Sequence, residues 1–357
     1  MVFYIRKNKF TFLLLFVIFL LLAALAPFYL PNKFFFDAYT IVIDLYNEAG
    51  YIGSYPLSMT FYRITKLGSI PFPMVALIQF PILFFILYKI GIPAKFHVVT
   101  IKNVVTYLGM LMIAVFISMP SKEFITYIYT SSIVFLYKSE TISFKKLLYL
   151  SMAILIIFGI MFRPYFVLIP VIAIGMYWIT FIKLKNKTIM TVAYGLLIAI
   201  FLSLSYGLVK GEYFSASTRE ELNQLRLNAE ASNTIILSPI PADTWYGESV
   251  GIIYGFFSVN VPLNGLKHIL SPQVVGFIIW QLLLFWILLV RFSWCLKDRK
   301  KYIRELWILL IILSYFIIQG IFEPDLGSAV RHKIGMFPLI YYAFYYEDFR
   351  KKLSTAV

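Results

Sequence analysis

Cysteine, histidine and acidic side chains are scarce in this chain of 357 residues. The single cysteine, Cys295, allows no internal disulfide and no Cys/His cluster, which excludes a disulfide scaffold, structural zinc and iron–sulfur sites. No Walker A loop, GxGxxG or HExxH motif occurs. ATP-driven transport, chemistry on a soluble nucleotide-sugar domain and zinc proteolysis therefore lose support.

Apolar residues are what the chain has in abundance. It is 61% hydrophobic and 19% aromatic but only 14% charged, far outside the range of a soluble globular protein. This composition predicts a polytopic membrane protein. The first 26 residues resemble a secretory signal, but their apolar run is long and Pro27 follows directly, so we expect an uncleaved first transmembrane helix.

Apolar runs long enough to cross about 30 Å of hydrocarbon recur along the chain. We expect an all-α fold, a polytopic membrane helical bundle that forms a single integral membrane domain over residues 1–357. About ten transmembrane helices are expected, near residues 10–29, 72–92, 99–118, 123–137, 147–162, 165–182, 188–209, 273–293, 305–322 and 334–347.

The distribution of charge predicts the orientation of these helices. With the N-terminus inside, inner segments hold about 21 of the 32 Lys and Arg residues, so both termini are expected to be cytoplasmic. This orientation also explains the net charge of +15 through contact with anionic membrane lipids. No nucleic-acid partner is needed.

Two outer segments, residues 30–71 and 210–271, are too long for turns and too apolar for disorder. In the first, the spacing of Asp37, Asp44 and Glu48 would place three carboxylates on one face of an interfacial helix. Such a face is often merely solvated. Alternatively, Asp37, which follows three phenylalanines, is held at the membrane boundary as a general base.

The second long segment contains the helix-like stretch STREELNQLRLNAE. Arg219 and Arg226 are seven residues apart and share a helix face. One interpretation is a charged surface helix. The other is a binding site for a pyrophosphate or a sugar, because arginine binds phosphate through two parallel hydrogen bonds.

Three short outer segments concentrate charge between predicted spans. They are MPSKEF with Lys122 and Glu123, MFRPYF with Arg163, and EPDLGSAVRHK with Glu323, Asp325, Arg331, His332 and Lys333. The basic side chains could simply reach lipid head groups, with Lys122 and Glu123 neutralising each other. Basic groups gathered at one depth, however, favour an anion-binding cavity.

A lipid with an anionic head fits this pattern. A polyprenyl-diphosphate-linked glycan carries its own leaving group, so its transfer needs no nucleotide. The protein must hold the diphosphate with basic side chains and supply a carboxylate or histidine that accepts the proton of the acceptor hydroxyl. Asp37, Glu123, Asp325 and His332 all stay open as that base, and Lys122, Arg163, Arg331 and Lys333 as diphosphate ligands.

The order of motifs FFFDAYT, PSKE, FRP, TREELNQLR, RHK and MFPLI resembles that of Wzy-type O-antigen or capsular polysaccharide polymerases, within the broader GT-C-like membrane glycosyltransferases. The resemblance implies a cofactor-independent enzyme of the bacterial inner membrane that joins undecaprenyl-diphosphate-linked repeat units on the periplasmic side. It implies a catalytic Asp37, and diphosphate or glycan binding by Arg163, Arg219, Arg226 and Arg331. A chain-length regulator and a flippase of the same pathway would be its partners.

Three other functions remain open. A GT-C transferase could add a single sugar from a polyprenyl-phosphate donor. A lipid-linked oligosaccharide flippase would instead place ionisable residues inside its spans and show two related halves, neither of which is evident. An acyltransferase would need a histidine base near the cytoplasm, where His97 stands alone.

Overall fold

The computed structural model describes residues 6–43, 48–227 and 234–354; the side chains of residues 33, 225–227 and 351–354 lie outside the description. The chain divides into two compact units, Met1–Pro164 with Arg331–Val357, and Tyr165–Val330. In the described residues helices form every element, beside one isolated antiparallel bridge between Ile235 and Asp325. The all-α prediction is confirmed. The single membrane domain stays a prediction and would contain both units.

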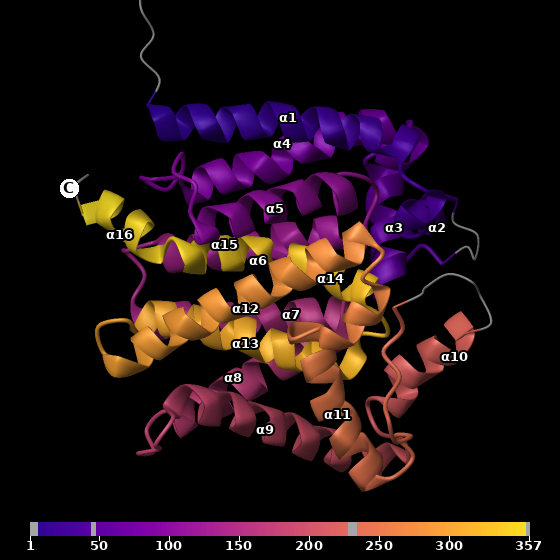
Figure 1. The fold of residues 1–357 in the computed structure, drawn as a ribbon, viewed down its shortest axis with the longest axis vertical. Coiled ribbons are helices and arrows are strands. Elements are labelled where there is room, and N and C mark those ends of the chain that lie inside the picture. Colours follow the sequence, from indigo (N-terminus) through magenta and orange to yellow (C-terminus); the bar gives the residue numbers. More distant parts are fainter. Residues whose placement is uncertain (1–5, 44–47, 228–233, 355–357) are drawn as a thin grey trace, which may run out of the picture. The chain divides into compact units, whose positions relative to one another are not determined.

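The first unit contains most of the N-terminal half and the C-terminal helices (Figure 1). Its α-helices are α1 (Lys7–Tyr29), α2 (Phe36–Ile43), α3 (Ser54–Ile64), α4 (Phe72–Ile90), α5 (Ile101–Phe116), α6 (Lys122–Lys138), α7 (Phe144–Met161), α15 (Phe337–Phe344) and α16 (Tyr346–Ser354). The boundary between the units falls within α14 (Leu326–Gly335).

The second unit is built from α8 (Leu168–Ile179), α9 (Lys187–Lys210), α10 (Glu221–Leu227), α11 (Trp245–Asn260), α12 (Pro272–Lys297) and α13 (Ile303–Phe322). A π-helical turn, η4 (Ala216–Glu220), precedes α10. The helix expected in STREELNQLRLNAE is therefore present. The segment 210–271 also contains the 16-residue helix α11, so it is more ordered than a loop.

Six helices of the described chain are long and apolar enough to cross a membrane: α1, α4, α7, α9, α12 and α13. The helices α5 and α8 are apolar but shorter. A polytopic helical membrane protein is thus supported. The count of ten spans and the cytoplasmic placement of both termini stay predictions.

The helix ends follow ordinary capping chemistry. Ser121 accepts a hydrogen bond from Phe124 N at 3.1 Å and so caps the N-terminus of α6, as Thr100 does for α5. Helix α4 ends at Gly91, whose φ of 138° suits glycine, and a Cβ there would lie 2.8 Å from the Phe349 ring. The Ser121 cap fixes Lys122 and Glu123 in the first turn of α6.

The structure corrects two expectations for the outer segments. Residues 326–335 form α14 rather than a turn, because Asp325 caps the helix by accepting a hydrogen bond of 2.8 Å from Ser328 N. The expected span at 334–347 is consequently broken at Met336, between α14 and α15.

The expected helix face with three carboxylates, Asp37, Asp44 and Glu48, is also incomplete. Helix α2 carries Asp37 in its first turn and ends at Ile43, and Glu48 has no helical structure. Asp44 lies outside the described residues.

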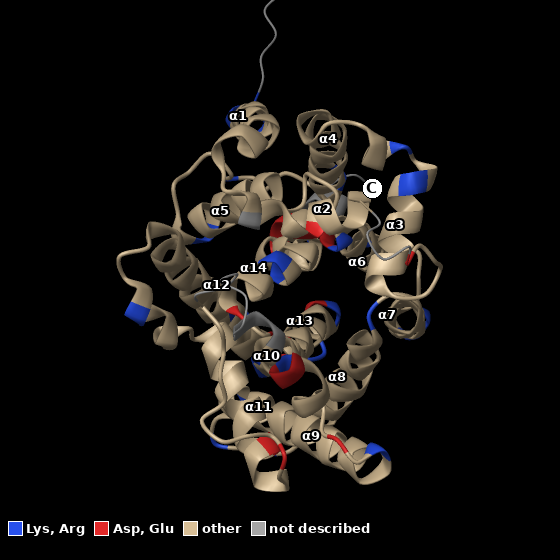
Figure 2. Ribbon diagram, turned by 90° about the vertical axis from the view of Figure 1, so that its right-hand side faces the viewer, with Lys and Arg blue, Asp and Glu red and all other residues tan. Residues whose placement is uncertain are grey.

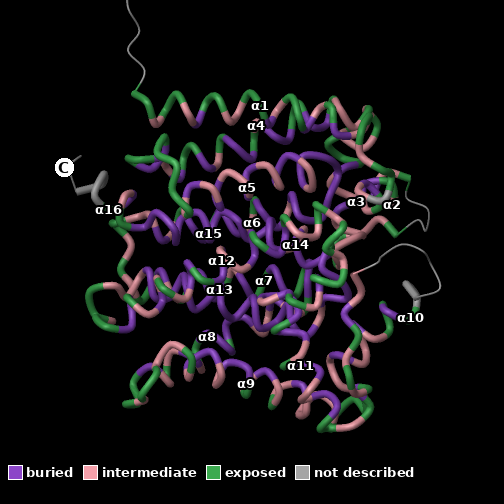
Figure 3. Tube along the Cα trace, in the orientation of Figure 1, coloured by how far each residue is buried: buried purple, intermediate pink, exposed green. Residues whose placement is uncertain are grey.

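Burial differs sharply between helices. Figure 3 shows α13 buried along nearly all its length, whereas α1 exposes much of its apolar surface. Buried apolar side chains on every face make α13 the core of the second unit, and the exposed leucines of α1 fit contact with lipid.

Candidate functional site

Charged side chains gather in the first unit where α2, α3, α6 and α14 meet the turn that follows α7. Figure 2 shows the acidic and basic segments of α2, α6 and α14 next to one another. We call this group the charged cluster. Its members are Asp37, Tyr55, Lys122, Glu123, Arg163, Arg331 and His332.

Asp37 lies at the centre of one half of the charged cluster. Its Oδ2 accepts a hydrogen bond of 3.0 Å from Arg331 NH1 and lies 3.7 Å from Lys122 Nζ. Its Oδ1 accepts a hydrogen bond of 2.8 Å from the hydroxyl of Tyr55. The Lys122 ammonium also lies 3.6 Å from the centroid of the Tyr55 ring, within range of a cation–π interaction.

These contacts keep Asp37 ionised. Burial raises the pKa of its carboxyl, but the charges of Lys122 and Arg331 outweigh that effect and lower the pKa from 3.8 to about 2. Burial and the adjacent Asp37 charge raise the pKa of Tyr55, so its hydroxyl keeps its proton. Asp37 is therefore a fixed anion that holds two cations, and a weak proton acceptor near neutral pH.

Glu123 is the centre of the other half. Its Oε1 lies 2.5 Å from Arg163 NH2 and 3.2 Å from His332 Nε2. The side chains of Glu123 and Arg163 are only 1% and 4% exposed, whereas those of His332 and Arg331 are 19% and 20% exposed. The inner pair is thus shielded, and His332 and Arg331 are its more accessible neighbours.

The Glu123–His332 contact fixes the orientation of the imidazole. When Nε2 donates to the carboxylate, a neutral imidazole carries its lone pair on Nδ1. A histidine oriented by a buried carboxylate is a common arrangement for a general base. The geometry therefore favours His332, with Glu123 in support, over Asp37 as the proton acceptor.

Secondary structure holds the two halves together. Ser121, the cap of α6, also donates its backbone N–H to the Tyr62 hydroxyl of α3 at 3.0 Å. The backbone N–H of Gly53, just before α3, donates to Met161 O at the end of α7 at 2.8 Å. Pro164, three residues after Met161, starts a short 3-10 turn.

Space inside the charged cluster is small. A cavity of about 10 Å³ lies among Asp37, Glu123 and Arg331, room for about one water molecule. The three basic side chains Lys122, Arg163 and Arg331 exceed the two carboxylates by one, so the net charge is +1 with a neutral imidazole. The ion pairs of the charged cluster occupy its interior and leave a positive excess.

Six of the predicted site residues come together here: Asp37, Lys122, Glu123, Arg163, Arg331 and His332. Lys122 and Glu123 attract each other, but the closest partner of each is another residue, Asp37 for Lys122 and Arg163 for Glu123. Lys333 is fully buried on α14, and Asp325 uses its carboxylate to cap that helix. Sequence analysis missed Tyr55, which no motif signals.

Arg219 and Arg226 belong to the second unit. The side chain of Arg226 lies outside the described residues. The Arg219 guanidinium is fully buried and donates to the backbone carbonyls of Gly251 on α11, at 3.1 Å, and Gly320 on α13, at 2.8 Å. In this structure it joins two helices, and its role in substrate binding stays a prediction.

Glycines make this contact of Arg219 possible. Gly247, Gly251 and Gly255 recur every fourth residue on α11, and a Cβ at Gly255 would lie 1.9 Å from Gly320 O and 2.3 Å from Arg219 NH1. Small residues at this spacing let helices approach closely in membranes. The repeat is visible in the sequence and was the missed signal for this helix pair.

No metal site is evident in the described part of the chain, where no three His, Cys or acidic side chains are grouped as metal ligands. No family model matches the chain, and the comparisons with curated proteins and with solved structures gave no significant match.

Proposed function

We propose that this protein is a polysaccharide polymerase of the bacterial inner membrane, which joins polyprenyl-diphosphate-linked repeat units at the periplasmic face. The observation that carries the proposal is the charged cluster, a net-positive group with the partly exposed Arg331 beside an imidazole held by a buried carboxylate. It combines the two requirements of this chemistry, a clamp for a diphosphate leaving group and a proton acceptor.

Arg331 and Lys122 would hold the diphosphate. Both interact with Asp37 Oδ2, and both can exchange that carboxylate for phosphate oxygens of the donor lipid. Asp37 keeps the two cations in place before the donor arrives. As the bond between the anomeric carbon and the diphosphate breaks, the leaving group takes the electron pair, and the cations stabilise its growing charge.

His332 would accept the proton of the incoming hydroxyl. The hydroxyl oxygen of the acceptor repeat unit forms the new bond to the anomeric carbon, and its proton passes to the imidazole. Glu123, which holds Nε2 at 3.2 Å, stabilises the resulting imidazolium. Arg163 neutralises Glu123 and keeps it buried, so its effect on catalysis is indirect.

Surface polysaccharide from a strain without this gene tests the proposal. Polymerase activity predicts a single repeat unit on the lipid core, restored to a ladder by the wild-type gene but not by the His332→Ala variant. A full ladder of altered sugar composition would contradict polymerisation and identify transfer of a single sugar. Complete loss of the polysaccharide would contradict it in favour of transport or an earlier step.

A further inference from the structure

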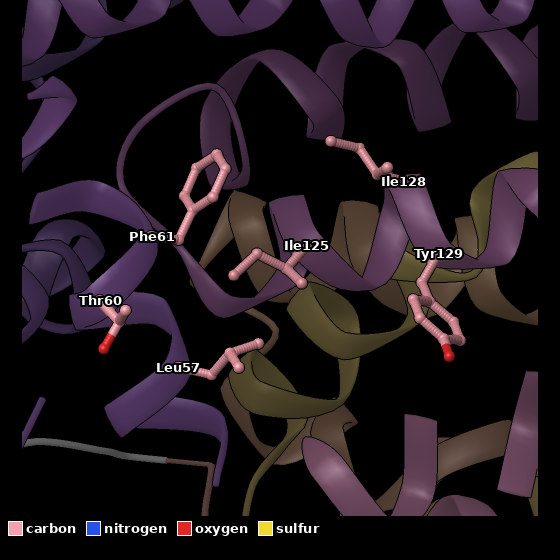
Figure 4. A pocket seen from close by; sticks show the side chains of 6 residues that line it. All are labelled: Leu57, Thr60, Phe61, Ile125, Ile128 and Tyr129. Atoms are coloured by element: carbon pink, nitrogen blue, oxygen red, sulfur yellow. The ribbon is translucent and has the colours of Figure 1, made fainter. Parts of the chain in front are cut away.

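An apolar groove lies beside the charged cluster in the first unit. It has a volume of about 330 Å³, within the range of roughly 300–1,000 Å³ that is usual for small-molecule sites. Figure 4 shows its lining side chains, which come from the two helices α3 and α6. They are Leu57, Thr60, Phe61, Ile125, Ile128 and Tyr129.

The lining offers a ligand very little polarity. The Thr60 hydroxyl donates to Gly50 O at 2.7 Å, so its hydrogen is already used within the protein. The ring of Tyr129 packs on that of Phe158 with centroids 4.3 Å apart. A sugar or a peptide backbone would lose hydrogen bonds in this groove, whereas a hydrocarbon chain would lose none.

Helices α3 and α6, which line the groove, also carry Tyr55 and Lys122 of the charged cluster. Tyr55 precedes Leu57 on α3, and Lys122 begins α6, about 10 Å along the helix axis from Tyr129 at 1.5 Å per residue. Lys122 therefore lies one helical turn before Ile125 of the groove lining. The ligand that matches both ends has an anionic head and an apolar chain.

We propose that the groove between α3 and α6 binds the isoprenoid chain of the lipid carrier, in the units next to its diphosphate. The inference rests on the proposed function, which supplies the carrier, and adds a binding site for its chain. Branched isoprene units suit a wall of Ile, Leu and aromatic side chains, and Lys122, one turn before Ile125 on α6, supplies a positive charge for the diphosphate.

Binding of the chain is remote from the reacting atoms. Such binding stabilises substrate and transition state alike, so a defect in the groove raises KM for the lipid substrate and leaves kcat nearly unchanged. Loss of a cation in the charged cluster lowers kcat instead. This difference separates the groove from the catalytic group.

Photocrosslinking of the full-length protein in nanodiscs of phosphatidylethanolamine and phosphatidylglycerol tests the inference. The probe is a polyprenyl phosphate with a diazirine in its first isoprene units. We expect crosslinks to residues 57–61 and 125–129. Ile128→Trp, which fills the groove, should reduce them about tenfold, as loss of a buried apolar contact would.

Ile82→Trp on α4 is the matched control. Ile82 and Ile128 are 41% and 40% exposed, but Ile82 does not line the groove, so its variant should crosslink as wild type. If Ile128→Trp fails to fold, Ile128→Cys modified after purification with a bulky maleimide replaces it, because Cys295 is buried.

Equal crosslinking of the Ile128→Trp and Ile82→Trp variants would overturn the inference. So would equally strong competition by a phosphatidic acid, which would mean a groove for ordinary lipids. The assay needs no catalysis. A normal polysaccharide ladder with unlabelled groove peptides would refute the chain site alone, and specific labelling in a protein without polymerase activity would refute the proposed reaction alone.

Discussion

Arg331 donates a hydrogen bond of 3.0 Å to Asp37, although 294 residues separate them in the chain. The next residue, His332, contacts Glu123 instead. Two consecutive residues of α14 therefore contact two different carboxylates of the first unit, Asp37, which holds the cations, and the buried Glu123, which holds the imidazole. Their adjacency couples the proposed diphosphate clamp to the proposed base.

The first prediction concerns Arg331. Arg331→Ala should lower the rate of transfer between lipid-linked repeat units by about 100-fold or more, because one donor to the leaving group is lost. Lys122 and Tyr55 still hold Asp37, so the amount of protein in the membrane should stay near normal. The exposed Lys300 provides the control, and Lys300→Ala should have wild-type activity. Normal transfer by the Arg331 variant would refute the clamp.

The second prediction concerns the buried pair of Arg163 and Glu123. Arg163→Ala leaves a carboxylate buried without its main partner and should destabilise the protein by about 3–5 kcal/mol. Removing both charges should cost less than the sum of the two single changes, because no buried charge is left uncompensated. Melting temperatures of the purified single and double variants measure this, and additive effects would contradict the pairing.

Much of this arrangement follows from local sequence, but the partners do not. The caps at Ser121 and Thr100 are local signals for the starts of α6 and α5, and Pro164 is a local signal for the break between α7 and α8. The pairing of Lys122 with Asp37 does not follow from local sequence. The sequence suggests the neighbouring Glu123 as the partner of Lys122, and only the packing of α2 on α3 and α6 brings Asp37 to it.

Two local signals were also outweighed. The charge of residues 323–333 predicted a short connection between two spans, yet the cap at Asp325 starts a helix there. Glycine is by itself typical of loops, but the four-residue spacing of the glycines of α11 is the pattern of a close helix crossing. Tyr55 carries no such signal and could be found only from the structure.

The third prediction concerns the pH dependence of stability. The pKa of Asp37 is lowered from 3.8 to about 2, so its stabilising contribution is complete above about pH 4 and lost as the pH falls through 2. The shift corresponds to about 2 kcal/mol. Asp37→Asn should therefore be less stable than wild type at pH 7 and equally so at pH 5, with the difference shrinking only below about pH 4.

Unfolding curves of the purified wild-type and Asp37→Asn proteins between pH 7 and pH 3 measure this difference. Tyr55→Phe is the companion variant, because it removes one hydrogen bond to Asp37 and leaves both ion pairs. It should keep most of the stability. A difference between wild type and Asp37→Asn that disappears by pH 6 would mean that Asp37 is not held as an anion.

The fourth prediction concerns the glycine contact in the second unit. Gly255→Ala would place a Cβ 1.9 Å from Gly320 O and 2.3 Å from Arg219 NH1, so α11 must move away from α13. Overpacking of this kind costs about 1–3 kcal/mol. The displacement also weakens the hydrogen bonds of the buried Arg219 guanidinium, which makes the upper end of that range the expected result.

Gly276 on α12 is the matched control for this change. A Cβ there meets nothing within 4 Å, so Gly276→Ala should be neutral or stabilise its helix by up to about 1 kcal/mol. The melting temperatures of the two variants should thus move in different directions. If Gly255→Ala were as stable as Gly276→Ala, α11 and α13 could not cross as closely as they do here, and Arg219 would be released as a side chain that a ligand could reach.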